Sequence, residues 1–380
     1  MNIENAVQQR YSAASRVAEP GLCCPVDYDP QYLAAIPDDV LAKDYGCGDP
    51  VSHVRAGERV LDLGSGAGKV CFIASQIVGS NGSVLGVDIN DDMLAVARKA
   101  QPEVARRLGY GNVGFAKARI EDLALDLEFL DAHLARHPVR SHDDLTKLVD
   151  LSDRLRRDSP LVPDESIDVV ISNCVLNLVA PDRKQDMFHE IARVLRGGGR
   201  AIISDIVSDI DVPAAMQADP DLWSGCYSGA LQEERFLDGF IQAGLTGLTI
   251  LKREARPWET VGDVEFRSVT IAAYKPLSPP PPVSGPAAIY RGPFATVTTD
   301  TGLHLHRGQV VPVSPQHLPA ITSGAYFEHI MMLESEAPAS ERTAHPSDNA
   351  TASNADGQGA PTVHYRPFAL PDVPKGSCDC

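Results

Sequence analysis

The stretch that decides the fold is DLGSGAGKVCFIASQIVG, residues 62–79, in which an apolar run passes into a glycine-rich turn and then into a helical pattern. The glycines Gly64, Gly66 and Gly68 allow the backbone to turn sharply and to approach a ligand closely. Asp88 ends the next apolar run, where a carboxylate can accept hydrogen bonds from both hydroxyls of a ribose. The stretch therefore predicts a nucleoside-binding turn between a strand and a helix.

Strand-like and helix-like patterns alternate around this turn. Short apolar runs predict five strands, at RVLDL, SVLGVDIN, NVGFAKARI, SIDVVISNCVL and RAIISDIV. Helices are predicted between them, and the helix in DRKQDMFHEIARVLRGGG is expected to end at its glycines. Such alternation implies a mostly parallel sheet that is covered on both faces, so the predicted fold class is α/β with a Rossmann-like, doubly wound sheet.

The composition limits the classes of function. The chain has 380 residues, enough for two or three domains, and its 34 basic and 51 acidic residues give a net charge of −17. This charge argues against nonspecific binding to nucleic acid or to an anionic membrane surface. No apolar run approaches the roughly 20 residues that span a bilayer. The N-terminal residues lack the architecture of a signal peptide, so a cytoplasmic location is expected.

Changes in composition divide the chain into parts. A proline run follows the predicted sheet, and prolines favour a stiff, extended linker because they cannot donate ladder hydrogen bonds. Short β segments joined by turns come next, and the remaining chain is poor in apolar residues, which predicts disorder. The predicted parts are an N-terminal segment, a cofactor domain with a helical insertion, a proline-rich linker, a small β-rich C-terminal module and a disordered tail, over residues 1–54, 55–275 (insertion at about 121–160), 276–286, 287–334 and 335–380.

The spacing of the glycine turn separates two kinds of cofactor fold. A dinucleotide fold usually carries G-x-G-x-x-G, whereas this turn is G-x-G-x-G with an acid two residues before the first glycine. Over residues 55–275 the pattern resembles the Rossmann-like, class I S-adenosylmethionine-dependent methyltransferases. A nicotinamide fold and a generic α/β turn without a cofactor remain as alternatives.

The resemblance to class I methyltransferases implies S-adenosylmethionine as the methyl donor. It places Asp62 near the methionine amino group and Met93 beside the adenine, while Ile120 and Glu121 close the adenine pocket. The implied cofactor-binding residues are Asp62, Gly64, Gly66, Gly68, Asp88, Met93, Ile120 and Glu121.

Cysteines gather in and just before the predicted cofactor domain, at Cys23, Cys24, Cys47, Cys71, Cys174 and Cys226. Free cysteine is among the most buried residue types, and packing explains Cys71 in the apolar helix VCFIASQIV well. By contrast, Cys47 lies in the turn-like YGCGDP, Cys174 ends the fourth predicted strand, and Cys226 is flanked by glycines. Three thiolates from separate loops at the ligand-binding edge of one sheet would make a trap for a soft metal. No C-x-x-C spacing is present, so no structural metal is expected.

Four stretches together resemble the arsenite methyltransferases, namely YGCG at 45–48, DLGSGAGKVCFIASQIVG at 62–79, ISNCVLNLV at 171–179 and LWSGCYSGAL at 222–231. The YRG-containing segment after the proline run also resembles that family's small C-terminal module. The resemblance implies arsenic detoxification by methyl transfer from S-adenosylmethionine to arsenite and methylarsenite. It further implies thioredoxin or glutathione as the reductant. By position, the implied arsenic-binding thiols are Cys47, Cys174 and Cys226, and the implied relay cysteine is Cys23 or Cys24.

The implied chemistry suits these residue types. Trivalent arsenic is soft and binds thiolates far better than oxygen ligands. When three sulfurs bind it, arsenic keeps a lone pair that can accept a methyl group, so no general base is needed. The chain departs from the family in its doubled Cys23–Cys24, in its terminal Cys378-Asp-Cys380, and in the insertion at 121–160, which could reshape the substrate entrance.

Two other classes of function remain open. A methyltransferase that acts on carbon, nitrogen or oxygen of a small metabolite would use the cysteines only for packing and would need a base, for which Asp205 or His189 is available. A non-enzymatic thiol binder would sequester arsenic or antimony, but sequestration needs no nucleoside pocket. His304 and His306, in HLHR, alternate on a strand-like segment and are expected to be exposed rather than to bind a metal.

Overall fold

The computed structural model describes residues 3–17, 19, 26, 28–43, 45–277, 286–292, 294, 296–323 and 329–333. The cysteines Cys23, Cys24, Cys378 and Cys380 lie outside the described residues, as do most of the predicted proline-rich linker and the whole predicted tail, 335–380.

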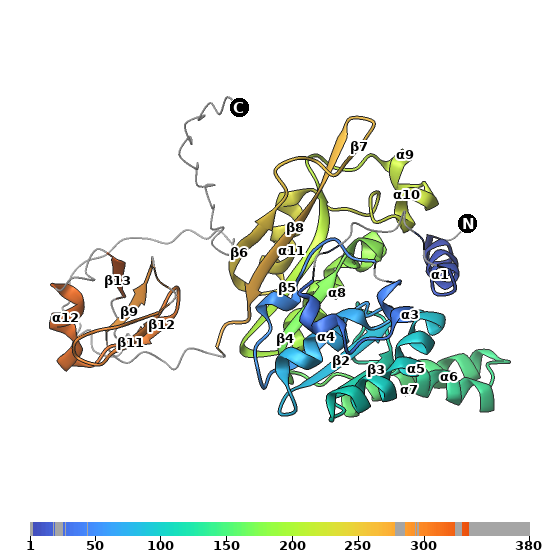
Figure 1. Ribbon diagram of the computed structural model, residues 1–380, viewed down its shortest axis with the longest axis horizontal. Coiled ribbons are helices and arrows are strands. Elements are labelled where there is room, and N and C mark those ends of the chain that lie inside the picture. Colours follow the sequence, from blue (N-terminus) through green and yellow to red (C-terminus); the bar gives the residue numbers. More distant parts are fainter. Residues whose placement is uncertain are drawn as a thin grey trace, which may run out of the picture.

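A central sheet of eight strands forms the main body of the protein (Figure 1). Its order is β3-β2-β1-β4-β5-β8-β6, with β7 paired to β8. The five strands from β3 to β5 are parallel to one another, whereas β8 is antiparallel to β5, β6 and β7. The strands are β1 (Arg59–Leu63), β2 (Ser83–Asp88), β3 (Val113–Lys117), β4 (Ile167–Asn173), β5 (Leu195–Ser208), β6 (Thr246–Arg253), β7 (Glu259–Val261) and β8 (Val264–Tyr274).

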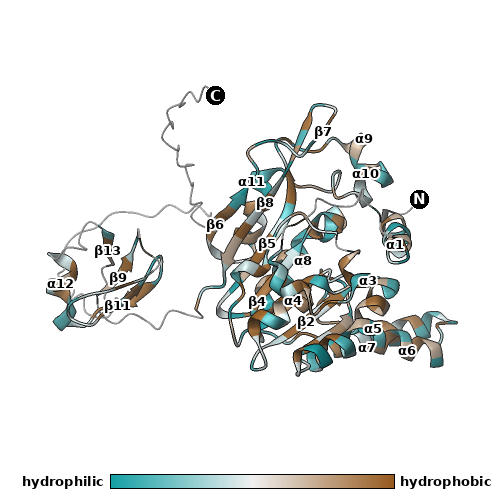
Figure 2. Ribbon diagram, in the orientation of Figure 1, coloured by the Kyte–Doolittle hydropathy of each residue, from teal (hydrophilic) through white to brown (hydrophobic). Residues whose placement is uncertain are grey.

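Helices cover both faces of this sheet, which confirms the predicted doubly wound α/β fold. Side chains alternate along β1, so Val60 packs with helices α4 and α5, whereas Leu61 and Leu63 pack with helices α8 and α11. Figure 2 shows hydrophobic residues concentrated in the sheet strands. The covering helices are α4 (Lys69–Val78) and α5 (Asp91–Leu108) on one face, and α8 (Lys184–Val194) and α11 (Glu233–Gln242) on the other.

Two predicted helix ends were wrong. Helix α8 ends at Val194, before the glycines, and β5 begins at the next residue. A Cβ placed at Gly199 would lie 3.0 Å from the backbone oxygen of Asp168. The missing side chain therefore allows close pairing of the strands and does not mark the end of a helix. The pattern DDMLAVARKA predicts a helix over residues 91–100, but helix α5 continues through Pro102 to Leu108, because Val104 keeps its apolar face buried.

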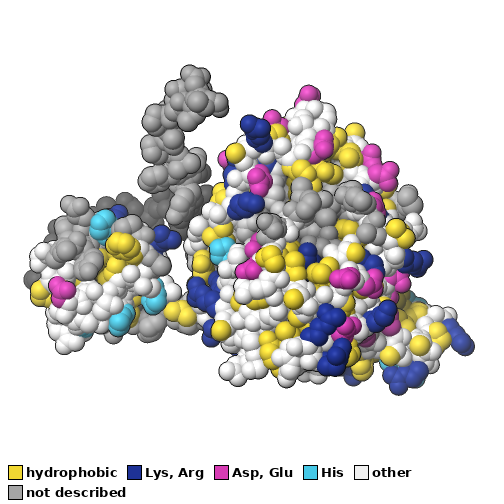
Figure 3. Space-filling model, in the orientation of Figure 1, with side chains coloured by type: hydrophobic (Ala, Val, Ile, Leu, Met, Phe, Trp, Pro, Cys, Tyr) yellow, Lys and Arg dark blue, Asp and Glu magenta, His cyan; other side chains and the backbone are white. Residues whose placement is uncertain are grey.

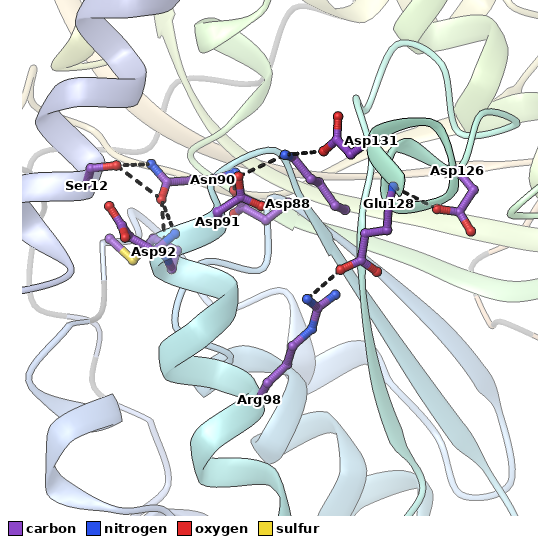
Figure 4. Close-up of polar contacts among 11 residues, drawn as sticks. Ser12, Asp88, Asn90, Asp91, Asp92, Arg98, Asp126, Glu128 and Asp131 are labelled. Carbon is purple, nitrogen blue, oxygen red and sulfur yellow. Dashed lines mark hydrogen bonds and ion pairs between the residues drawn. The ribbon is translucent and has the colours of Figure 1, made fainter. Parts of the chain in front are cut away.

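The stretch predicted as an insertion contains two helices, α6 (Leu127–Arg136) and α7 (His142–Asp158). Ion pairs join α6 to the β3 edge of the sheet. Lys117 of β3 lies 2.8 Å from both Asp91 and Asp131, and Arg98 of α5 lies 2.6 Å from Glu128 (Figure 4). The strand order therefore separates α6 from the β4–β5–β8 side of the sheet.

Shorter elements lie at the N-terminus and around β5. Helix α1 contacts both α10 and α5, and so lies over the carboxyl ends of the strands. These elements are α1 (Ile3–Ala14), α2 (Pro30–Leu33), α3 (Asp38–Leu41), α9 (Ala214–Gln217) and α10 (Pro220–Ser224), and the 3-10 helices η2 (Val51–His53), η3 (Leu176–Leu178) and η4 (Pro181–Arg183).

The C-terminal elements form two small antiparallel sheets, β10-β11 and β12-β9-β13, as the predicted β-rich module requires. Tyr290, Leu305 and Ile321 are buried in its core, while His304 and His306 are exposed as expected. The elements are β9 (Ala287–Tyr290), β10 (Thr296–Thr298), β11 (His304–His306), β12 (Val310–Pro312), β13 (Ile330–Leu333), η5 (Pro315–His317) and α12 (Leu318–Thr322).

On the face drawn in Figure 3, basic and acidic side chains are interspersed over the main body. Among the described residues, no helix is both long and apolar enough to cross a membrane.

Candidate functional site

The glycine turn between β1 and α4 has the left-handed backbone that its sequence predicts. Gly64, Gly66 and Gly68 have φ of 68°, 51° and 88°, values that favour glycine. A Cβ at Gly64 would collide with Val175, and one at Gly68 would lie 2.7 Å from Phe115. Gly66 has open space at that position, so its backbone is the part of the turn that a ligand can approach.

A cavity of about 490 Å³ opens beside this turn, within the range typical of small-molecule sites. Its lining includes every predicted cofactor residue except Gly68, which instead precedes the first turn of α4. One predicted arsenic thiol, Cys174, also lines it. The predicted residues brought together are Asp62, Gly64, Gly66, Asp88, Met93, Ile120, Glu121 and Cys174.

Asp88 joins the glycine turn to the end of β2. Its Oδ2 accepts a hydrogen bond from the Gly66 N–H and its Oδ1 accepts one from the Asn90 N–H, both at 2.8 Å. Burial raises the pKa of Asp88, and these backbone N–H groups oppose that shift. Each carboxylate oxygen retains a lone pair, so Asp88 can still accept hydrogen bonds from a ligand.

Asp62 and Cys71 form a buried pair behind the turn. The Cys71 thiol donates to Asp62 Oδ2 at 3.1 Å. Burial and the neighbouring carboxylate raise the pKa of Cys71 well above its usual value. Cys71 is thus a packed, unreactive thiol.

Helix α1 supplies cavity residues that the motif analysis missed. Gln8 and Tyr11 line the cavity, and the Asn90 side chain donates to Gln8 O at 3.1 Å. The same side chain donates to Ser12 Oγ, also at 3.1 Å (Figure 4). The Tyr11 hydroxyl also lies 3.9 Å from the Cys226 sulfur. One N-terminal helix therefore contacts both the cofactor cavity and a predicted arsenic thiol.

The three predicted arsenic thiols converge on one cluster at the β4–β5–β8 side of the sheet. Cys47, Cys174 and Cys226 are 8%, 4% and 3% exposed and pack with Ile206 and Phe266. Burial alone would also fit a packing role. The backbone conformation does not fit a packing role, because Cys174 and Cys226 have φ of 64° and 66°. Among the described non-glycine residues, only Glu165 shares such a positive φ. A left-handed residue costs roughly 1–2 kcal/mol, and such strain gathers at functional sites.

The three thiols share one buried cluster, in which Cys226 contacts the backbone of Cys174. The Cys226 thiol donates to the Cys174 carbonyl at 3.3 Å. Hydrogen bonds with the thiols of Cys226 and Cys47, together with burial, raise the pKa of Cys174 well above its usual value. Burial also raises the pKa of Cys47. Both thiols are therefore protonated at neutral pH. Among the described residues, no three His, Cys, Asp or Glu side chains are already arranged to hold a metal ion.

Two asparagines in SNCVLN fix the loops that carry Cys47 and Cys226. Asn173 Oδ1 accepts from the backbone N–H groups of Cys47 at 2.8 Å and Gly48 at 3.0 Å, and its Nδ2 donates to Gly48 O at 2.7 Å. Asn177 Nδ2 donates to Cys226 O at 3.1 Å. A single segment thus carries one thiol and positions the other two, a role that the sequence analysis missed.

We expect Asn173→Ala to destabilise the protein by about 2–4 kcal/mol, because it leaves several buried backbone groups of the Cys47 loop unpaired. Arsenic capture should fall together with stability. Denaturant unfolding measures the first effect, and Asn112→Ala, which removes a comparable cluster of side-chain-to-backbone bonds remote from the thiols, serves as the control. Equal arsenic affinity in the folded Asn173 and Asn112 variants would show that Asn173 has no positioning role.

The two bases available to a different methyltransferase lie away from the cavity lining. Asp205 is fully buried and accepts hydrogen bonds from the N–H groups of Leu176 and Ile206, both at 2.8 Å. Burial raises the pKa of Asp205 to about 6 and lowers the pKa of its buried neighbour Lys184 to about 8. His189 is exposed on α8. Neither Asp205 nor His189 lines the cofactor cavity.

Similarity to known proteins centres on one group of enzymes. A family described as a methyltransferase domain matches residues 55–146 and 149–244, and a domain of unknown function matches residues 282–360. An arsenite methyltransferase of Aquipseudomonas alcaligenes is 32% identical over 307 residues, which cover 77% of this chain and 78% of that protein. The arsenite methyltransferase of Mus musculus is 32% identical over 273 residues, which cover 70% of this chain and 63% of that protein.

A solved structure agrees with these sequence relationships. The crystal structure of an arsenic(III) S-adenosylmethionine methyltransferase from Chlamydomonas reinhardtii matches with a TM-score of 0.53 and 26% identity. The match covers 83% of this chain and 98% of that chain.

Proposed function

This chain belongs to the arsenite methyltransferase family, and on that premise we propose that Cys47, Cys174 and Cys226 hold trivalent arsenic while it receives methyl groups from S-adenosylmethionine. One observation carries the proposal. Cys174 lines the cofactor cavity, and its side chain packs in one buried cluster with those of Cys47 and Cys226. A substrate held by these sulfurs would thus lie at the wall of the cavity that holds the methyl donor.

The cavity residues suit S-adenosylmethionine, which supplies a methyl group on a sulfonium centre when bound. Asp88 offers acceptors for the ribose hydroxyls, and Asp62 offers a carboxylate for the methionine ammonium group. Met93 and Ile120 offer apolar surface for the adenine. The open position at Gly66 leaves room for close approach to the backbone. Helix α6 contributes Leu127 and Asp131, so the insertion helps to form the cofactor cavity.

Three thiols in one cluster suit the capture of arsenite. Each exchange breaks one As–O bond and forms one As–S bond, and the thiol proton leaves with the hydroxide as water. Three exchanges therefore release three waters and need no external base. The arsenic lone pair remains available to accept the methyl group.

Methyl transfer oxidises arsenic by two electrons, and the proposed relay returns them. Two thiols lose two electrons and two protons as they form a disulfide. We assign this step to Cys47 and to Cys23 or Cys24, with thioredoxin or glutathione reducing the disulfide in the cytoplasm. Val26, which follows Cys24 by two positions, and Cys47 both line a second cavity, which supports this pairing.

Asp88→Ala should weaken S-adenosylmethionine binding by about 1–3 kcal/mol, because the ribose hydroxyls lose a buried acceptor. Titration calorimetry measures this change. Asp92→Ala is a matched control, since Asp92 lies nearby on α5 but does not line the cavity. Unchanged affinity in the Asp88 variant would remove the ribose assignment.

The direct assay of function combines the purified protein with arsenite, a reducing thiol and methyl-labelled S-adenosylmethionine. Methylated arsenic species that carry the label are the expected product. Stoichiometric binding of arsenite without any labelled product would favour sequestration, and label on an organic acceptor alone would favour a different methyltransferase.

A further inference from the structure

Helix α1 bridges the cofactor cavity and the loop that carries Cys226. Figure 1 shows α1 beside α10, the short helix that precedes this loop. Arg10 of α1 donates to Asp221 O and to Ser224 Oγ, both at 3.0 Å, and so ties α1 to α10. The next residue, Tyr11, lines the cofactor cavity and places its hydroxyl 3.9 Å from the Cys226 sulfur. Cys226 itself does not line that cavity, so Tyr11 links the two.

The hydrogen-bonding capacity of the Cys226 thiol fixes the direction of its contact with Tyr11. A thiol has one proton, and the Cys226 S–H donates to the Cys174 carbonyl at 3.3 Å. The Tyr11 hydroxyl is therefore the donor in its contact with the sulfur, whose large radius lengthens such bonds. Burial, together with the neighbouring Cys226 and Cys174, raises the pKa of Tyr11 well above its usual value. The hydroxyl thus keeps its proton at neutral pH.

Arsenic capture would change these two contacts of Cys226 in opposite ways. When the Cys226 sulfur forms an As–S bond, its proton leaves with a hydroxide as water. The sulfur then cannot donate to the Cys174 carbonyl, but it keeps lone pairs that can accept from the Tyr11 hydroxyl. Of these two contacts, only the one with Tyr11 survives when arsenic binds.

We propose that the Tyr11 hydroxyl holds the Cys226 sulfur while that sulfur carries arsenic, which makes Tyr11 a positioning residue that aligns the arsenic with the methyl donor. This role rests on the proposed function, because it requires Cys226 to bind arsenic. The ring of Tyr11 has a separate role. It lines the cofactor cavity and packs edge-on against Tyr45, another residue of the cavity wall, with the ring centroids 6.2 Å apart.

Two variants of the full-length protein separate the hydroxyl from the ring. In Tyr11→Phe, kcat for arsenite methylation should fall about fivefold, as one hydrogen bond is lost, while KM for S-adenosylmethionine stays the same. Tyr11→Ala should also raise that KM about fivefold, because the ring leaves the cavity wall. The control is Tyr110→Phe, which should match the parent. The Tyr110 hydroxyl donates to Ser75 O at 3.4 Å, and Tyr110 does not line the cofactor cavity. An unchanged kcat in Tyr11→Phe, or the same rise in KM in both Tyr11 variants, would contradict the proposal.

A double-mutant cycle tests whether Tyr11 acts through Cys226. Arsenite binding is measured by equilibrium dialysis without methyl donor. Tyr11→Phe should weaken it about fivefold in the parent and leave it unchanged in Cys226→Ser, where arsenic has lost that ligand. Comparison within each background cancels any general effect on folding. The same loss in both backgrounds, or no loss in the parent, would overturn the proposal. A parent protein that yields no methylated arsenic would instead refute the proposed function, and the binding cycle would still decide the role of the Tyr11 hydroxyl.

Discussion

Cys174→Ser should lower the methylation of both arsenite and methylarsenite to the rate seen without enzyme. Serine preserves the shape of the side chain but replaces a soft sulfur with a hard oxygen, which binds trivalent arsenic poorly. Among the described cysteines, Cys174 alone lines the cofactor cavity, so its loss should remove the thiol that presents arsenic there. Product analysis for both substrates measures the effect, and Cys226→Ser should behave in the same way.

Cys71→Ser is the matched control, because Cys71 is equally buried but hydrogen-bonds to Asp62 and not to the other thiols. A serine hydroxyl can still donate that hydrogen bond, so most of the activity should remain. Far-ultraviolet circular dichroism and unfolding midpoints establish that each variant folds. A folded Cys174→Ser/Cys226→Ser protein that methylates arsenic at the parent rate would return these cysteines to a packing role.

Replacing both candidate relay cysteines should lower the methylation of arsenite more than the methylation of methylarsenite. Arsenite can use three thiols, whereas methylarsenite already has one position occupied by carbon and depends less on the full set. Cys23→Ser/Cys24→Ser should therefore suppress methylation of arsenite yet leave methylarsenite methylation partly intact in excess external thiol. Both residues must change, because either neighbour can substitute for the other.

The two substrates are compared in that double variant under identical thiol concentrations. Full activity on arsenite would show that no N-terminal relay operates. Total loss on both substrates would point to a structural role for this segment. Each single variant should retain activity on arsenite if the neighbours are interchangeable.

The parts of the fold that could be predicted are those that local sequence encodes. The turn at Gly64–Gly68 has left-handed backbone at three positions, and each of these positions is a glycine, the residue that adopts this backbone most readily. The parallel strands could also be predicted, because each of them is a short apolar run in the sequence. The end of α8 could not be predicted from its glycines, because a glycine can either end a helix or allow two strands to pack closely. Gly199 has the second role.

The site was predicted less completely, because its supports join residues far apart in the chain. Asn173 bonds the backbone of Cys47, and Tyr11 approaches Cys226, across separations that no local pattern records. The sequence did contain one indication that the loop carrying Cys47 is closely packed. The glycines on either side of Cys47 leave no room for side chains, since a Cβ at Gly46 would collide with Asn173 and one at Gly48 would lie 2.5 Å from Ser204 Oγ.

X-ray absorption spectroscopy of one equivalent of arsenite bound to the protein, without methyl donor or other thiols, tests the central claim most directly. The account predicts that arsenic has three sulfur neighbours and no oxygen neighbour, and that Cys174→Ser and Cys226→Ser each replace one sulfur with oxygen. Oxygen neighbours in the parent protein, or a sulfur shell that is unchanged in both variants, would contradict it.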